Sequence, residues 1–234
     1  QGTIDALMLG RVSPEALAAV AVGNLYFFNV IVFGIGLLMA LDPVIAQAIG
    51  AHDHVGVARG VQRGVVLAVL TAIVAAVMMA PVDAVLRIAR QPESVIPDAS
   101  AYVRWSILGV LPFQLFNALR QSLQAMHRVL PMALAVLIAN LVNVLLNWIL
   151  IFGKLGAPAL GVAGAAHATW ITRWLMVLLI AWFAWRDLGP TLRPWRPESF
   201  ALRPLGALIA LGAPIGLQLS AEGLAFGFTG VMMG

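Results

Sequence analysis

The chain has 234 residues, of which 62% are hydrophobic and only 10% are charged, and its mean hydropathy is +0.96. A soluble domain carries about 25% charged residues, so this composition excludes a water-soluble protein and indicates an integral membrane protein. The formal charge is +4, but the basic residues stand in short loops between apolar stretches, which argues against nucleic-acid binding. The sequence contains no cysteine, and this excludes disulfides, thiolate metal sites and a cysteine nucleophile.

The first segment, Gln1–Gly10, is too short to cross a bilayer, and we expect it to be the end of a severed helix. Six apolar stretches follow, each long enough for the roughly 20 residues that a spanning helix needs. We place them at residues 15–41, 61–80, 97–124, 130–152, 161–185 and 205–234. The last stretch has no exit loop, so we expect a truncated helix there. The sequence therefore predicts an all-α, polytopic transmembrane bundle that is part of a longer protein.

Proline and glycine mark special points within these stretches. Pro43, Pro112 and Pro214 lie inside or near the end of a predicted span. Because proline lacks an N–H and its ring clashes with the preceding turn, we expect these helices to kink or break there. Gly212 and Gly216 form a small-xxx-small pair, which predicts that another helix approaches this face closely.

The connections are short, so successive helices reverse direction and the loops alternate between the two membrane faces. One face collects Arg59, Arg63, Arg128, Arg186, Arg193, Arg196 and Arg203, and the other holds Arg11, Arg87, Arg90 and Lys154. The positive-inside rule makes the richer face cytoplasmic. We expect a multi-pass protein of the inner (plasma) membrane. The longest connection, residues 187–204, is basic and proline-rich, and we expect it to separate two lobes.

Polar side chains recur at helical spacing in three of the spans. They are Gln114, Asn117, Gln121 and Gln124; Asn140, Asn143 and Asn147; and Gln218 with Glu222. Such spacing puts each set on one helix face, which should turn towards the bundle interior or a water-filled cavity. Interhelical hydrogen bonding explains any one set, but a shared aqueous cavity explains the three together better.

Glu222 is the only ionisable residue between Pro204 and Gly234. A charge at the bilayer centre costs about 2.5–3.5 kcal/mol, so this carboxyl either stays protonated, hydrogen-bonded to Gln218, or has a function. We favour a function, in which Glu222 binds and releases a proton or exchanges it for a cation. Asp5 raises the same question at the other end of the chain.

The remaining charged residues and motifs give weaker signals. Arg120 and Arg173 can snorkel from span ends to the interface, and we expect them to anchor helices rather than bind substrate. His52 and His54 have no matching ligands elsewhere, so we predict no metal site. No phosphate-binding loop, nucleophile elbow or zinc-protease motif is present, and we predict that the protein is not an enzyme.

Five segments of the chain, taken in order, resemble the first seven helices of the multidrug and toxic compound extrusion (MATE) transporters, especially the NorM-like branch. They are IDALMLGRVSPEALAAVAVGN, FGIGLLMALDPVIAQAIGA, PFQLFNALRQSLQAM, NLVNVLLNWILIFGKLGAPALGVAGAAHATWITRW and LGAPIGLQLSAEGLAFGFTGVMMG. This resemblance implies twelve helices in two six-helix bundles that face each other across a central cleft. Residues 1–186 would then be the N-terminal lobe with a truncated first helix, 187–204 the cytoplasmic linker, and 205–234 the truncated first helix of the C-terminal lobe.

The resemblance also implies a function, namely export of drugs and organic cations in exchange for sodium ions or protons. The family's functional acids fall on Asp5 and Glu222, which we expect to bind the coupling ion, and no other cofactor is predicted. The expected cleft residues are Gln218, Asn143, Asn147, Asn117, Gln121 and Thr169. A related branch has an aspartate in place of Asn147, and a proton site built on that aspartate is not expected here. The predicted partners are small molecules and the lipid bilayer, and the full-length protein is expected to be a monomer.

Two other functions remain open from the sequence. A lipid-linked oligosaccharide flippase of the same superfamily needs a cationic cavity for pyrophosphate, which Arg120 and Arg173 would supply if both lined a cleft. A structural membrane protein that transports nothing needs no cavity at all.

Overall fold

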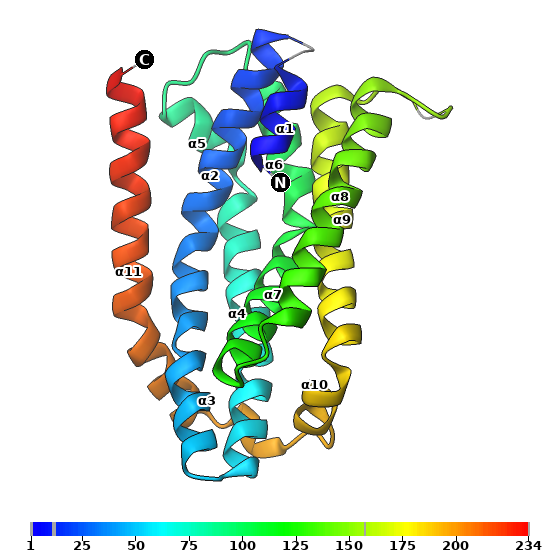
Figure 1. Cartoon of the computed structure of the whole chain (residues 1–234). Coiled ribbons are helices and arrows are strands. Elements are labelled where there is room, and N and C mark those ends of the chain that lie inside the picture. Colours follow the sequence, from blue (N-terminus) through cyan, green and yellow to red (C-terminus); the bar gives the residue numbers. More distant parts are fainter. Residues whose placement is uncertain (1, 11–12, 157, 234) are drawn as a thin grey trace.

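The computed structural model describes residues 2–10, 13–156 and 158–233, and every regular element within these ranges is a helix (Figure 1). The helices are α1 Gly2–Leu9, α2 Pro14–Met39, α3 Leu41–Gly50, α4 His54–Met79, α5 Val82–Ile88, α6 Ile96–Ile107, α7 Val110–Ala125, α8 Leu130–Phe152, α9 Gly161–Phe183, α10 Trp185–Leu192, the 3-10 helix η1 Pro197–Phe200 and α11 Leu202–Met233. Long helices run side by side along the bundle, and this confirms the predicted all-α fold.

Five stretches of the described residues are long and apolar enough to cross a membrane. They are Pro14–Gly50, His54–Met79, Leu130–Phe152, Gly161–Phe183 and Leu202–Ala225. Five of the six predicted spans are thereby confirmed. The remaining prediction, a single helix over residues 97–124, was wrong, because this stretch consists of α6 and α7 with a break between them.

The helix breaks lie one turn before the prolines. The junction between α6 and α7 falls at Leu108 and Gly109, and Leu108 is the residue whose carbonyl would pair with an N–H at position 112, where proline has none. The junction between α2 and α3 falls at Ala40, three residues before Pro43. Pro214, in contrast, lies inside α11 without interrupting it.

The connections alternate between the two ends of the bundle, as the short loops predicted. The α3–α4 and α7–α8 connections meet α10 and η1 at one end, and α5 and the α8–α9 connection lie at the other (Figure 1). The first end carries ion pairs of the richer basic set, Arg59 with Glu198 at 3.8 Å and Arg128 with Asp187 at 3.1 Å. At the other end, Arg104 pairs with Asp83 and joins α6 to α5.

The expected linker is hydrogen-bonded to α4 by the side chain of Gln62, which is fully buried. Its Nε2 donates to the carbonyl oxygens of Thr191 at 2.8 Å and Pro194 at 3.0 Å. Its Oε1 accepts from the Arg196 N–H at 2.9 Å and the Ser199 hydroxyl at 2.7 Å. One glutamine therefore fixes the path of the chain from α10 to η1.

Helix α11 packs against α2 through glycine. A Cβ atom added to Gly36 would lie 2.3 Å from the Cα of Gly216, and one added to Gly212 would lie 2.6 Å from the carbonyl oxygen of Leu37. Backbone thus meets backbone at this interface, and the close approach predicted for Gly212 and Gly216 is confirmed.

Candidate functional site

Asp5 lies at the centre of a polar cluster inside the bundle and is fully buried. Its Oδ1 accepts a hydrogen bond from Asn147 Nδ2 of α8 at 2.7 Å, and its Oδ2 accepts one from the Thr169 hydroxyl of α9 at 2.8 Å. The Tyr102 hydroxyl of α6 lies 3.3 Å from the same Oδ2. Residues from three other helices therefore converge on a carboxylate carried by α1.

A second layer of polar groups surrounds this cluster. The Tyr102 hydroxyl also lies 3.0 Å from Asn24 Oδ1 of α2, and Asn147 Nδ2 lies 3.4 Å from Asn143 Oδ1. A hydroxyl has one proton to donate and can also accept, so Tyr102 can donate either to Asp5 or to Asn24. Asn147 Oδ1 and Asn143 Nδ2 are buried and have no hydrogen-bond partner within the described part of the chain. The cluster thus contains one acceptor and one donor that could bind a further group.

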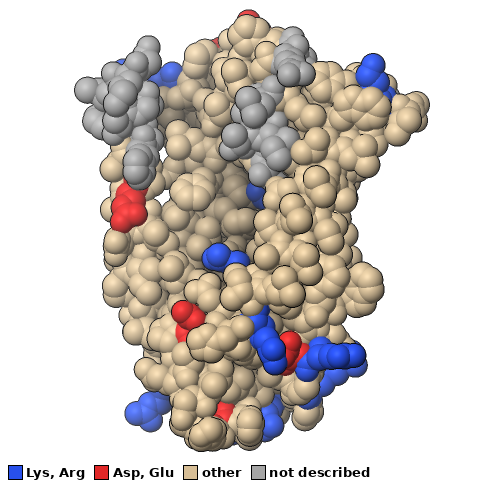
Figure 2. Space-filling model, viewed as in Figure 1, with Lys and Arg blue, Asp and Glu red and all other residues tan. Residues whose placement is uncertain are grey.

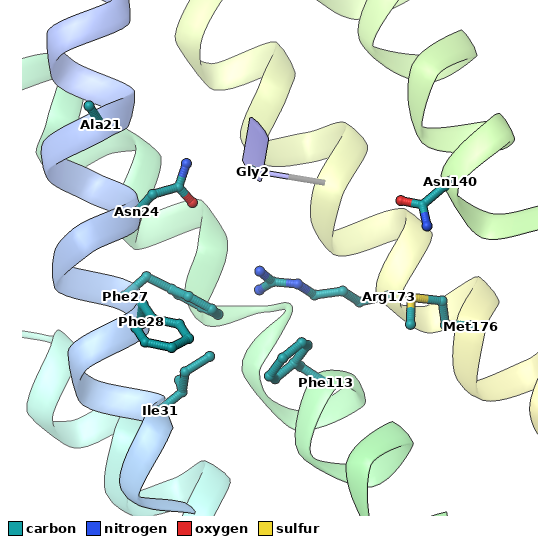
Figure 3. A pocket seen from close by; sticks show the side chains of 10 residues that line it. All are labelled: Gly2, Ala21, Asn24, Phe27, Phe28, Ile31, Phe113, Asn140, Arg173 and Met176. Atoms are coloured by element: carbon teal, nitrogen blue, oxygen red, sulfur yellow. The ribbon is translucent and has the colours of Figure 1, made fainter. Parts of the chain in front are cut away.

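A cavity of about 670 Å³ opens between α2, α7, α8 and α9, next to the start of α1. We call it the Arg173 cavity; Figure 3 shows its lining residues, Gly2, Ala21, Asn24, Phe27, Phe28, Ile31, Phe113, Asn140, Arg173 and Met176. Asn24 belongs both to this lining and to the layer around Asp5, so the cavity adjoins the buried carboxylate. On the face seen in Figure 2 the molecule is hollowed, and basic side-chain atoms are visible within the hollow.

Arg173 enters this cavity from α9 and reaches between two aromatic rings (Figure 3). Its guanidinium carbon lies 4.2 Å from the ring centre of Phe27 and 5.1 Å from that of Phe113. The side chain is only 7% exposed. The expectation that Arg173 snorkels to the interface was therefore wrong, because its helix turns it into the bundle, where aromatic faces attract its charge.

The structure divides the predicted cleft residues among three places. Asn143, Asn147 and Thr169 surround Asp5. Asn117 and Gln121 are buried on α7, and Asn117 Nδ2 donates to the carbonyl oxygen of Phe113 in its own helix at 2.8 Å.

Gln218 is exposed on α11 and donates to Glu222 at 3.0 Å. Glu222 is exposed as well, and α11 lies on the opposite side of α2 from α1 (Figure 1). Within the described residues the two predicted acids, Asp5 and Glu222, therefore have separate surroundings.

Sequence reasoning did not single out Tyr102 and Asn24, which complete the surroundings of Asp5. Asn24 lies within the predicted span 15–41. Polar side chains within a span are expected to face the bundle interior or a cavity, and this reasoning would have identified Asn24. Tyr102 gives no comparable signal, because a tyrosine near a span end is ordinarily an interfacial residue.

Asn147 should contribute more to stability than its neighbour Asn140, although both are amides on α8. Replacing Asn147 with leucine removes the 2.7 Å donor to a buried carboxylate, and we expect this to cost about 1–3 kcal/mol. Asn140 donates to the carbonyl of Val136 in its own helix at 2.9 Å, so Asn140→Leu should cost less. Melting temperatures of the two purified variants in detergent check this, and equal losses would contradict the assigned role of Asn147.

Comparison with known proteins identifies relatives over nearly the whole chain. The family model MatE matches residues 2–149. The multidrug resistance protein MdtK of Edwardsiella ictaluri is 32% identical over 224 residues, 94% of this chain and 49% of that protein. The multidrug resistance protein NorM of Vibrio cholerae is 35% identical over 182 residues, 78% of this chain and 40% of that protein.

The fold has a counterpart among solved structures. The crystal structure of the eukaryotic MATE transporter AtDTX14 matches 97% of this chain and 50% of its own length, with a TM-score of 0.88 and 21% identity. The chain thus spans about half the length of the relatives that it matches.

Proposed function

Because this chain belongs to the MatE family, whose members are transporters and not enzymes, we propose that the complete protein is a secondary active antiporter. It exports drugs and organic cations from the cell in exchange for sodium ions or protons. The observation that carries this proposal is Asp5, a carboxylate that is fully buried in a membrane bundle and held by side chains from α6, α8 and α9. Intramembrane carboxylates with polar partners mark ion and proton sites.

The surroundings of Asp5 suit a reversible change of charge. With the carboxylate ionised, Asn147, Thr169 and Tyr102 can all donate to it. When a proton binds, Tyr102 can accept from Asp5 and direct its own proton to Asn24 Oδ1, 3.0 Å away. In the protonated state the Asp5 proton, the Tyr102 hydroxyl and Asn24 Oδ1 therefore all have a hydrogen-bond partner.

The same cluster can hold a sodium ion. The carboxylate, the Thr169 and Tyr102 hydroxyls and the Asn147 amide oxygen supply only oxygen ligands. Asn147 Oδ1 has no hydrogen-bond partner among the described residues, and a half-turn of the amide brings this oxygen towards Asp5. Binding of either ion favours one of two states in which the cleft opens to opposite membrane faces.

The rest of the chain fits the same scheme. We propose that the protein lies in the inner membrane. Residues 1–186 form the N-terminal lobe, residues 187–204 form a linker on the cytoplasmic side, and residues 205–234 begin the second lobe. Gln218 and Glu222 are exposed and hydrogen-bonded to each other on α11, which leaves them available to a second lobe. Glu222 then serves as the second ion-binding acid, and the monomer is the transporting unit.

Ion-driven export by the complete protein in liposomes tests this function. A cationic dye is loaded, a sodium or proton gradient is imposed, and export is followed by fluorescence. Asp5→Asn and Glu222→Gln remove an ionisable group with little change of shape, and each should reduce export by about tenfold or more. The gradient that drives export identifies the coupling ion.

Two exposed acids, Asp98 and Glu93, provide matched controls. Asp98→Asn and Glu93→Gln should export like the unaltered protein. Export that persists at full rate in both Asp5→Asn and Glu222→Gln would refute the proposed coupling sites.

One observation favours the flippase alternative in part. Arg173 lines the cavity, as a site for pyrophosphate requires, but Arg120, which lies partly buried on α7, does not belong to the cavity lining. A single guanidinium next to three phenylalanines matches a doubly charged pyrophosphate less well than it matches a small organic molecule.

A further inference from the structure

Arg173 places hydrogen-bond donors in the cavity that the ion site does not use. Its Nε and Nη1 are buried and have no hydrogen-bond partner within the described part of the chain. A guanidinium carries five N–H donors and stays charged, so unpaired donors at this depth are costly. The rings of Phe27 and Phe113 attract the charge but do not supply the oxygen acceptors that these N–H groups need.

The backbone leaves room for this side chain at the break between α6 and α7. A Cβ atom added to Gly109 would lie 3.0 Å from both Cδ and Nη1 of Arg173. The arginine stem therefore runs across a glycine at the helix junction, and its guanidinium is held at the wall of the cavity.

The rest of the lining defines the kind of molecule that fits. Phe27, Phe28 and Phe113 provide aromatic surface, and Asn24 and Asn140 provide amides (Figure 3). Of the described residues in this lining, Arg173 alone carries a charge, and it is positive. A volume of about 670 Å³ is typical of cavities that hold drug-sized ligands.

We propose that Arg173 is a substrate-binding residue, which takes the carboxylate of aromatic compounds that carry an acid group, either anions or zwitterions. A planar carboxylate pairs with a guanidinium through two parallel hydrogen bonds, which satisfies the unpaired donors. The aromatic body of the ligand then lies against the phenylalanine rings. This inference rests on the proposed export function and narrows its substrates.

A competing explanation is that Arg173 acts only on Asp5, with which it interacts electrostatically. The oxygens of Asp5 already receive hydrogen bonds from Asn147 and Thr169 at 2.7 and 2.8 Å. The two explanations differ in their consequences. An arginine that only tunes Asp5 affects the transport of every substrate alike, whereas a carboxylate-binding arginine distinguishes acids from their esters.

The test compares a rhodamine dye that has a free benzoate carboxylate with the methyl ester of the same dye. Binding to the complete purified protein in detergent is measured by fluorescence polarisation. Arg173→Gln should weaken binding of the acid by about tenfold or more and change binding of the ester by less than about threefold. Arg173→Lys keeps the charge but loses the planar guanidinium. Its affinity for the acid should therefore lie between those of the unaltered protein and Arg173→Gln.

Arg120→Gln is the matched control, because Arg120 is a partly buried arginine outside the cavity lining; it should leave both dyes unaffected. Melting temperatures establish that each variant is folded. Equal weakening of acid and ester by Arg173→Gln, no weakening of either, or failure of the unaltered protein to bind the acid would overturn the proposal. Since binding needs no gradient, acid-selective binding without ion-driven export would leave this proposal standing and refute the export function.

Discussion

Replacing Gln62 with leucine is expected to release the linker from α4 and to lower the stability of the protein by about 2–4 kcal/mol. The leucine keeps most of the volume but removes four hydrogen bonds, to Thr191, Pro194, Arg196 and Ser199. Ser199 is fully buried, so its hydroxyl would lose its partner without gaining water. The melting temperature in detergent measures the loss.

Proteolysis provides a second, local measurement of the same effect. Glu198 lies in η1 within the linker, and a glutamate-specific protease should cut after it faster in Gln62→Leu, because η1 is then less firmly held. Gln124→Leu is the matched control, since Gln124 is exposed at the end of α7. If the two variants melt and are cleaved alike, Gln62 does not hold the linker.

Replacing Gly36 with leucine is expected to force α11 away from α2 at a cost of about 3 kcal/mol. The first added atom would lie 2.3 Å from the Cα and 2.4 Å from the N of Gly216. These are backbone atoms, so no rotamer change relieves the overlap, and one helix must move. Because α11 is attached to the described bundle mainly along α2 (Figure 1), the variant should also show faster proteolysis within residues 197–204.

Gly206→Leu is the control for helix propensity and added apolar volume. Gly206 also lies in α11, but an added Cβ meets no atom of the described residues within 4 Å. This variant should melt at or above the temperature of the unaltered protein. A Gly36→Leu protein as stable as Gly206→Leu would show that the α2–α11 contact is not required for the fold.

Some residues of the candidate site could be predicted from the sequence, and others could not. Asp5, Asn143, Asn147 and Thr169 were expected from the family resemblance to be functional residues, and the structure brings them together. Arg173 could not be placed in the same way. Its position on α9 is compatible with snorkelling or with burial, and the choice depends on the rotation of that helix against α2 and α7.

The sequence by itself determined the membrane class, five of the six predicted apolar spans, the alternation of the loops and the helix breaks near Pro43 and Pro112. These features depend on composition, on bilayer thickness and on the local chemistry of proline, all of which act over a few neighbouring residues or over the chain as a whole.

Only the tertiary structure decided which polar groups meet. The contacts of Asp5 with Tyr102, Asn147 and Thr169 join residues 97, 142 and 164 positions apart, and the contacts of Gln62 with the linker join residues at least 129 positions apart. Helical periodicity fixes the face on which a side chain lies but not the direction in which that face turns. The rotation of each helix is set by packing against its neighbours, as the glycine contact between α2 and α11 and the insertion of Arg173 beside Gly109 show.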